Sequence, residues 1–198
     1  ECSRTERENI RSEKGAEVIK IKGNYDYAIK SSLGFVVAIR QKNQLIQDFS
    51  FIGYDEIPNW ISYGYTTLCS EIPFDPAVIF VPCGADSFAQ GVITYYRSHK
   101  SNTKVFSVEP DTAYTVNKSL VLQKASSDLG TSRTIMDELN CPRISATAFL
   151  LLQKGAIYFC LVSDEDCMQA IKTLGSLGVN QVHAELLRKP RLLDSLIN

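Results

Sequence analysis

Residues 81–91, VPCGADSFAQG, are the stretch of this 198-residue chain whose residue types could most directly bind a ligand. An apolar run is followed by a glycine, a hydroxyl and small residues, which is the order expected of a buried strand, a tight loop and the start of a helix. The N–H groups in the first turn of a helix are unpaired and partly positive, so anions, and phosphates above all, bind there. The alternative is an ordinary connection between a strand and a helix, because such junctions are common.

The side chains within this stretch have opposing effects on anion binding. Gly84 permits a sharp turn and Ser87 can donate a hydroxyl, while Ala89 and Gly91 are expected to keep the start of the helix close to the sheet. Asp86 places a carboxylate within reach of the same N–H groups, where it would repel an anion or cap the helix itself. The candidate phosphate-binding loop consists of Gly84, Ala85, Asp86, Ser87, Phe88 and Ala89.

Two carboxylates could act beside such a loop. Asp48 is expected to close a strand at residues 45–49, and a carboxylate there can be a general base if burial raises its pKa toward neutrality. The alternative for Asp48 is a loop acid that caps the next turn. Glu109 is expected near the end of a strand at residues 103–110, where it could face a ligand or accept backbone hydrogen bonds.

The elements that must position these residues follow from the apolar periodicity. Apolar and β-branched runs predict strands at residues 16–22, 45–49, 77–82, 103–110 and 156–162. Helical spacing predicts helices at residues 24–41, 56–72, 87–99, 144–154 and 164–177, with a broken helical region across 112–139. Ser163 and Asp166 have capping-box spacing at the start of the last helix. The helix-spaced aromatic residues Trp60, Tyr63 and Tyr65 are expected in the core.

Strands and helices alternate through most of the chain, which implies crossover connections between parallel strands. The predicted fold class is therefore α/β, with an open, mostly parallel, twisted sheet and helices on both faces. A ligand of such a sheet is expected at the carboxyl ends of the strands.

Composition excludes several other classes of protein. The formal net charge of -1 argues against nucleic acid as a partner, since a basic excess is usual in proteins that bind it. No apolar stretch is long enough to cross a bilayer, so no membrane association is expected. The six cysteines show no metal-ligand spacing. We expect reduced thiols, no metal site and a cytoplasmic protein.

Several segments together resemble diaminopropionate ammonia-lyases. GAEVIKIKGNYDYAI (15–29) is similar to the family's "GAEV…NYDDA", and IQDFSFIGYDEIPNWISYGYTTLCSEI (46–72) to its "QDT…GYEEIP.WI..GY.T...E". VIFVPCGADSFAQGV (78–92) stands where the family has its phosphate-cradling "V..GVGS.AG.V", and VFSVEP (105–110) matches the strand that follows. GTSRTIMDELNC (130–141) resembles "G...TIM.GL.C", and DEDCMQAIKTLGSLGV (164–179) matches the segment after it. The resemblance covers nearly all of residues 3–179.

The resemblance implies a fold, a cofactor and a reaction. The family has the tryptophan synthase β-like fold of type II pyridoxal-phosphate enzymes, and it converts 2,3-diaminopropionate to pyruvate and ammonia by α,β-elimination. Close relatives act on serine or threonine, so the implied substrate is a small amino acid. An aspartate matching Asp48 has an acid–base role in that active site, and the loop matching Gly84 to Ala89 holds the cofactor phosphate. A homodimer is expected.

The chain also departs from the family's pattern. Family members are about twice as long, and their Schiff-base lysine and Asn-Gly-His cofactor loop precede the segments matched here. None of the twelve lysines lies in a recognisable version of that motif. Asp86 replaces a glycine of the phosphate loop, and after Val179 the glycine-free NQVHAELLRKP replaces a segment that closes over the cofactor ring.

These departures leave alternatives open. The chain is expected to be an incomplete, C-terminal part of such an enzyme, with a pyridoxal-phosphate-enzyme-like region at 1–179 and a divergent helical tail at 180–198. The alternative is a catalytically inactive homologue that acts as a binding or assembly module. A nucleotide-binding α/β module is a third hypothesis, although no G-x-G-x-x-G motif supports it.

Overall fold

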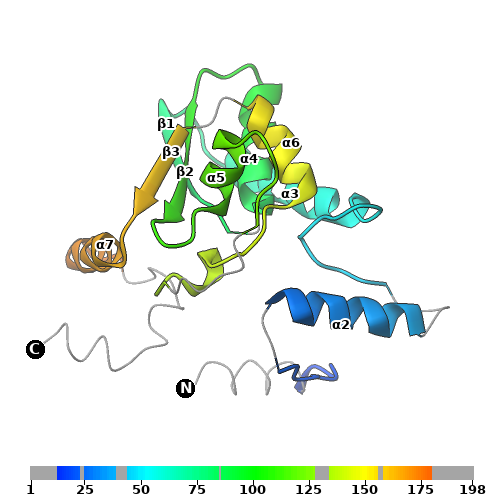
Figure 1. Ribbon diagram of the computed structural model, residues 1–198. Coiled ribbons are helices and arrows are strands. Elements are labelled where there is room, and N and C mark those ends of the chain that lie inside the picture. The colour runs from blue at the N-terminus through cyan, green and yellow to red at the C-terminus, as the bar shows by residue number, and fades with distance from the viewer. Residues whose placement is uncertain are drawn as a thin grey trace, which may run out of the picture. The chain divides into compact units, whose positions relative to one another are not determined.

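The computed structural model describes residues 13–22, 25–38, 44–84, 86–127, 134–155 and 158–179 (Figure 1). The chain forms two compact units, one from residues 1–45 with 171–198 and one from residues 46–170, and each is described by itself. No helix among the described residues is long and apolar enough to span a membrane.

The first unit contains helix α2 (Tyr25–Ala38), within the predicted helix 24–41. The predicted strand at 16–22 is wrong, because these residues form neither helix nor strand. A β-branched run becomes a strand only when a neighbouring strand accepts and donates its backbone hydrogen bonds, and no described strand pairs with it. The predicted tail at 180–198 lies outside the described residues.

The second unit is built on a three-stranded sheet of β1 (Val78–Pro82), β2 (Lys104–Pro110) and β3 (Tyr158–Val162), in that order. Both strand pairs are parallel, as predicted. Phe80 is paired with Phe106, which is paired with Tyr158, so the carboxyl ends of the three strands meet at one edge. The predicted strand at 45–49 is wrong: this segment runs irregularly into a tight turn bridged between Phe51 and Tyr54.

Helices α3 (Glu56–Ser70), α4 (Ser87–Ser98), α5 (Thr115–Val121) and α6 (Ala146–Lys154) complete this unit, with a short 3-10 helix at Asp137–Leu139 (Figure 1). The core forms where α4, α5 and α6 pack on one sheet face. Val81 and Val105 from the strands meet Ile93, Leu120 and Leu152 from the helices there. These five side chains are almost fully buried, and this layer fixes the position of the β1–α4 connection.

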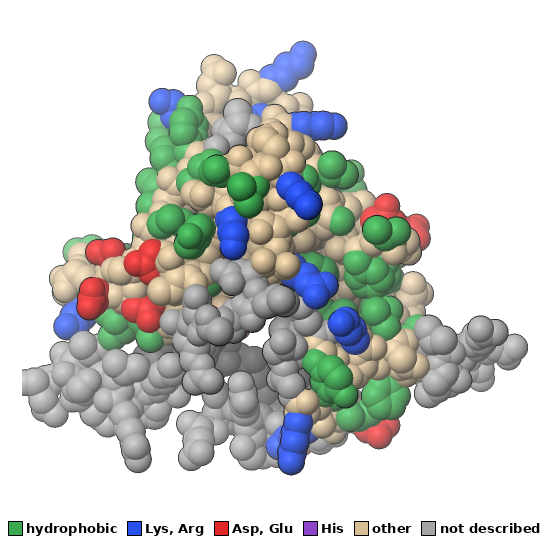
Figure 2. Space-filling model, viewed as in Figure 1, with side chains coloured by type: hydrophobic (Ala, Val, Ile, Leu, Met, Phe, Trp, Pro, Cys, Tyr) green, Lys and Arg blue, Asp and Glu red, His purple; other side chains and the backbone are tan. Residues whose placement is uncertain are grey.

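The other sheet face carries a row of aromatic rings. Phe80, Phe106 and Tyr158 stand side by side across the three strands, with ring centroids 5.1 and 4.8 Å apart. Phe80 is 62% exposed and Tyr158 is 47% exposed. Hydrophobic side chains also gather on the surface over the β1 edge in Figure 2. Parallel sheets are normally covered on both faces, so this face has the character of an interface.

Helix α3 packs against α4 through a close backbone approach. A Cβ on Gly91 would lie 2.5 Å from the Ser62 carbonyl oxygen, so Gly91 keeps α4 close to α3 and not to the sheet, contrary to prediction. Trp60, Tyr63 and Tyr65 are 60%, 62% and 37% exposed, so their predicted place in the core is also wrong. The buried side of α3 instead includes small residues such as Ser62 and Cys69.

Helix α7 (Asp164–Ser176) follows β3 and starts at the predicted capping box. The Asp166 N–H donates to Ser163 Oγ over 3.0 Å, and the Ser163 N–H donates back to Asp166 Oδ2 over 3.2 Å. Acidic side chains gather over this helix in Figure 2, and Asp164, Glu165 and Asp166 occupy its first turn. Negative charge at a helix N-terminus is stabilising, because it opposes the partial positive charge of the unpaired N–H groups.

Candidate functional site

The connection from β1 to α4 lies at the carboxyl edge of the sheet, as the sequence predicts for a binding loop. The Cys83 N–H donates to the Val108 carbonyl over 2.9 Å, which extends the β1–β2 pairing into the loop. Gly84 is tightly enclosed, since a Cβ there would lie 2.5 Å from the Glu138 carbonyl oxygen. The chain then turns into α4 at Asp86, whose backbone is left-handed with φ 73°. Such a conformation favours glycine, and aspartate and asparagine are among the other residues that tolerate it.

The structure brings Asp48 to the start of α4. The Ser87 hydroxyl donates a hydrogen bond of 2.8 Å to Asp48 Oδ2, although the two residues are 39 positions apart. Because 45–49 is not a strand, this bond and the neighbouring backbone, and not a sheet, hold the carboxylate. The Ser87 hydroxyl and the Asp48 carboxylate therefore lie together at the N-terminus of α4, a twelve-residue helix.

The other predicted loop residues divide into two groups. Phe88 packs edge-on against Tyr65, with ring centroids 5.2 Å apart, and Ala89 is fully buried in the core. Both side chains support the helix, so only their backbone could meet a ligand. Ala85 lies outside the described residues.

Asp86 is the unusual ionisable residue of this site. It is 3% exposed, and neither carboxyl oxygen has a hydrogen-bond partner among the described residues. Burial raises its pKa well above the ordinary value, and the charges of Glu109 and then Asp48 act in the same direction. The nearby Ser145 N–H favours the ionised form, but too weakly to reverse the effect of burial.

Glu109 caps a helix. Its carboxylate accepts hydrogen bonds from the backbone N–H groups of Val116 (2.7 Å) and Asn117 (2.8 Å), at the start of α5. The N-cap residue of α5, Tyr114, makes no side-chain cap, so Glu109 replaces it from the adjacent strand. Burial raises the pKa of Glu109 to about 7 despite these two bonds. Of the two roles the sequence left open for Glu109, the structure shows the acceptor of backbone hydrogen bonds.

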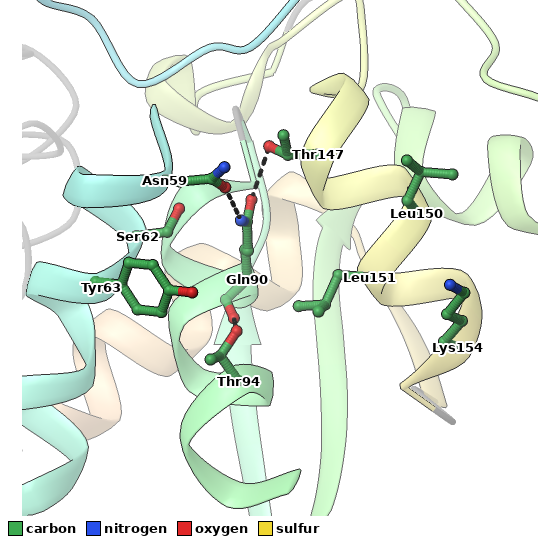
Figure 3. A pocket seen from close by; sticks show the side chains of 9 residues that line it. All are labelled: Asn59, Ser62, Tyr63, Gln90, Thr94, Thr147, Leu150, Leu151 and Lys154. Carbon is green, nitrogen blue, oxygen red and sulfur yellow. Dashed lines mark hydrogen bonds between the residues drawn. The ribbon is translucent and has the colours of Figure 1, made fainter. Parts of the chain in front are cut away.

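A group of buried hydroxyls, missed by the sequence analysis, holds the Asp48 segment against α6. Ser50 Oγ lies 2.6 Å from Ser145 Oγ and accepts a 2.8 Å bond from the Thr147 N–H. The Thr147 hydroxyl donates to Gln90 Oε1, and the Gln90 amide donates to Asn59 Oδ1 (Figure 3). This network joins α6, α4 and α3 just beyond the loop. Single serines and threonines carry no recognisable spacing, so nothing in the sequence points to this network.

The outer side of this network lines a cavity of about 330 Å³ between α3, α4 and α6 (Figure 3). Tyr63 and Lys154 stand at its sides, and Gln90 and Thr94 form its floor. Three of its lining residues belong to the network that lies beside the loop: Asn59, Gln90 and Thr147. We regard the cavity as part of the support of the site.

A parallel α/β sheet with a helix N-terminus and a carboxylate at its carboxyl edge defines an α/β enzyme-like protein, and comparison with known families specifies which. The model of the pyridoxal-phosphate dependent enzyme family matches residues 2–180. The chain belongs to that family.

The curated relatives are diaminopropionate ammonia-lyases, in agreement with the resemblance. The protein from Salmonella typhimurium is 30% identical over 176 residues, which cover 82% of this chain and 42% of the relative. The protein from Escherichia coli K12 is 28% identical over 171 residues with the same coverage. The chain thus spans less than half the length of these relatives.

Solved structures agree with the predicted fold. A crystal structure of the Escherichia coli diaminopropionate ammonia lyase is similar with a TM-score of 0.76 and 26% identity, over 92% of this chain and 47% of that one. Threonine deaminase isoform 2 from Solanum lycopersicum has a TM-score of 0.69 at 22% identity, over 84% of this chain and 46% of that one, and shows the fold alone. The fold is therefore tryptophan synthase β-like, and pyridoxal phosphate is the family's cofactor.

Proposed function

We propose that this chain forms the phosphate-binding and acid–base part of a pyridoxal-phosphate-dependent ammonia-lyase site. The proposed reaction is the α,β-elimination of 2,3-diaminopropionate, or a similar small amino acid, to pyruvate and ammonia. The proposal rests on family membership and on one contact, the 2.8 Å hydrogen bond from the Ser87 hydroxyl to the Asp48 carboxylate. This contact supports an acid–base role for Asp48 next to the candidate phosphate loop.

The loop has the donors that a phosphate needs. The first turn of α4 presents unpaired backbone N–H groups, whereas the single proton of the Ser87 hydroxyl is donated to Asp48. Asp86 decides the fit. An ionised carboxylate in a fully buried place would repel a phosphate, whereas a neutral carboxyl would add one O–H donor. Its burial and its two carboxylate neighbours favour the neutral form, so the residues fit the cofactor on that condition.

Each residue then has a defined task. The loop from Gly84 to Ala89 would hold the phosphate, mainly through backbone N–H groups. Asp48 would accept or return a proton at the substrate or cofactor, and the Ser87 hydroxyl would orient it. When bound, pyridoxal phosphate supplies an electron sink for the carbanion left by loss of the α-proton.

The experiment is pyruvate release from 2,3-diaminopropionate by the purified protein supplied with pyridoxal phosphate. Asp48→Asn is expected to lower turnover by about 10²-fold or more, since a positioned acid or base contributes about 10²- to 10⁴-fold. The affinity of this variant for pyridoxal phosphate is expected to change by much less than its turnover. Asp55→Asn is the matched control, because Asp55 is exposed on the same segment and lies before α3. Equal turnover in both variants would count against the assigned role of Asp48.

The second candidate is an inactive homologue that acts as a binding or assembly module. The aromatic face of Phe80, Phe106 and Tyr158 favours it, because such a sheet face is normally covered by further polypeptide. Absence of pyruvate release at saturating pyridoxal phosphate, together with stable association through this face, would select this function.

The remaining assignments are proposals at the same level. A homodimer would cover part of the aromatic face, and sedimentation of the wild type against Phe80→Ser measures it. We propose that the protein is cytoplasmic, because the described cysteines are free thiols. We also propose that it has no nucleic-acid partner, because its net charge is -1. The division into a region at 1–179 and a tail at 180–198 stays a prediction.

A further inference from the structure

The Asp86 carboxyl lies in the β1–α4 loop, where an anion would be held. The residue is 3% exposed, and both carboxyl oxygens are without a hydrogen-bond partner among the described residues. It precedes α4 directly but makes no side-chain cap with that helix. A buried polar group without a partner is costly, so the arrangement calls for a ligand or a proton.

The groups that face Asp86 are mostly acidic. Glu109 faces it from β2, Asp48 from the segment before α3, and the Cys83 thiol from the end of β1. On the α6 side the backbone N–H of Ser145 faces it. No lysine or arginine is among these groups. An ionised Asp86 would therefore add a further negative charge to a buried acidic site, and only Ser145 and the helix N-terminus would oppose it.

We propose that Asp86 is a protonated hydrogen-bond donor that makes oxyanion binding at the β1–α4 loop proton-coupled. The loop takes a phosphate group when the carboxyl is neutral and rejects it when the carboxyl is ionised. The inference deepens the proposed function and rests on it where the anion is the phosphate of the cofactor. The ligand chemistry is that of a phosphate monoester or free phosphate.

The chemistry of the carboxyl supports both states. A neutral carboxyl has one O–H donor, and the structure gives that donor no acceptor. A phosphate oxygen would supply the acceptor, while the N–H groups of α4 would bind the remaining oxygens. Above the pKa of Asp86, binding of one anion then requires uptake of one proton from solvent. The protein gains that proton on the carboxyl, and no other bond changes.

Two substitutions separate the side chain from its charge. Asp86→Asn keeps the shape, tolerates the left-handed backbone and presents an N–H donor at every pH. Asp86→Gly removes the side chain and suits the φ of 73°. Glu109 titrates too, with a pKa of about 7, and its charge acts on Asp86, so the chain with Asp86 and both substitutions are all measured in a Glu109→Gln background. That background removes the titration of Glu109 from every comparison.

The probe is sulfate, which stays a dianion from pH 5 to pH 9 and so reports protonation of the protein alone. It is titrated into the purified full chain at constant ionic strength, and the affinity is measured by calorimetry in two buffers of different ionisation enthalpy. The amide resonances of residues 87–91 localise the binding. With Asp86 present, the affinity is expected to fall by up to tenfold per pH unit above the pKa of Asp86, with up to one proton taken up. Asp86→Asn is expected to lose this dependence and to bind at pH 9 as tightly as the chain with Asp86 does at pH 5.

Two results would overturn the inference. One is a pH dependence in Asp86→Asn equal to that of the chain with Asp86. The other is sulfate binding that leaves the α4 amides unmoved, or no sulfate binding by any variant at any pH. A parallel titration with pyridoxal phosphate and with inorganic phosphate distinguishes the cofactor from free phosphate. Proton-coupled sulfate binding without pyruvate release from 2,3-diaminopropionate would leave this inference standing and refute the proposed function alone.

Discussion

Replacing Glu109 with glutamine is expected to remove a large part of the loss of stability that this protein suffers as pH rises. Glu109 is 2% exposed, and burial raises its pKa from 4.5 to about 7. A carboxyl with a higher pKa in the folded state stabilises the fold fully below pH 4.5, and this stability is lost as pH rises through 7. Since one pKa unit corresponds to about 1.4 kcal/mol, the whole loss is about 3 kcal/mol.

The assay is urea unfolding of the wild type and of Glu109→Gln at pH 4.5 and at pH 8. At pH 4.5 glutamine is close in shape to the neutral carboxyl, so the two free energies of unfolding are expected to differ by about 1 kcal/mol or less. At pH 8 the variant is expected to gain about 3 kcal/mol relative to the wild type. Glu71→Gln is the control, because Glu71 is exposed just after α3 and should change nothing. Equal losses between the two pH values in wild type and Glu109→Gln would refute the reasoning from burial.

Three further substitutions test the packing around the site. Gly84→Ala is expected to lower the free energy of unfolding by about 1–3 kcal/mol, because its Cβ would lie 2.5 Å from a backbone oxygen. Gly64→Ala is the control: its Cβ would lie in open space on α3, so it is expected to stabilise the protein by about 1 kcal/mol. Ser50→Ala is expected to cost about 1–3 kcal/mol, because it removes a hydrogen-bond partner of the Ser145 hydroxyl and of the Thr147 N–H. Ser70→Ala, at an exposed helix end, is the control, and equal effects of the two substitutions would contradict the role of the hydroxyl network. Phe80→Ser is expected to cost about 1 kcal/mol in urea unfolding, because it removes the ring contact with Phe106, and to lower the fluorescence of a bound hydrophobic dye. Unchanged fluorescence would mean that this face is not the exposed apolar surface.

Apolar periodicity and the positions of glycine and capping residues predicted those helices and strands that are determined by nearby residues. The strands at 78–82 and 104–110, helix α4 and the capping box of α7 all follow from apolar runs, a glycine or a capping pair within a few residues of one another. The runs at 16–22 and 45–49 have the same composition as strands and are not strands, because a strand depends on a partner that composition does not reveal. The prediction that the aromatic residues of α3 are buried was wrong for a related reason. Helical spacing shows that Trp60 and Tyr63 lie on the same side of the helix, but it does not show which side faces the core.

The site was partly predictable. The rule that ligands bind at the carboxyl ends of parallel strands predicted the position of the loop at Gly84, but it was misapplied to Asp48, because 45–49 is not a strand. Only the family resemblance pointed to the contact between Asp48 and this loop. The contact of Ser50 with Ser145 bridges 95 positions between residues of no distinctive pattern, so it needed the structure. The charge on Asp86 likewise depends on burial and on Glu109, neither of which the sequence displays.

The most direct test of this account is a crystal structure of the purified protein grown with pyridoxal phosphate. The account predicts the phosphate group within hydrogen-bond distance of the N–H groups in the first turn of α4, with the Ser87 hydroxyl still donating to the Asp48 carboxylate beside it. A cofactor bound elsewhere on the chain, or one whose phosphate lies away from the start of α4, would contradict it.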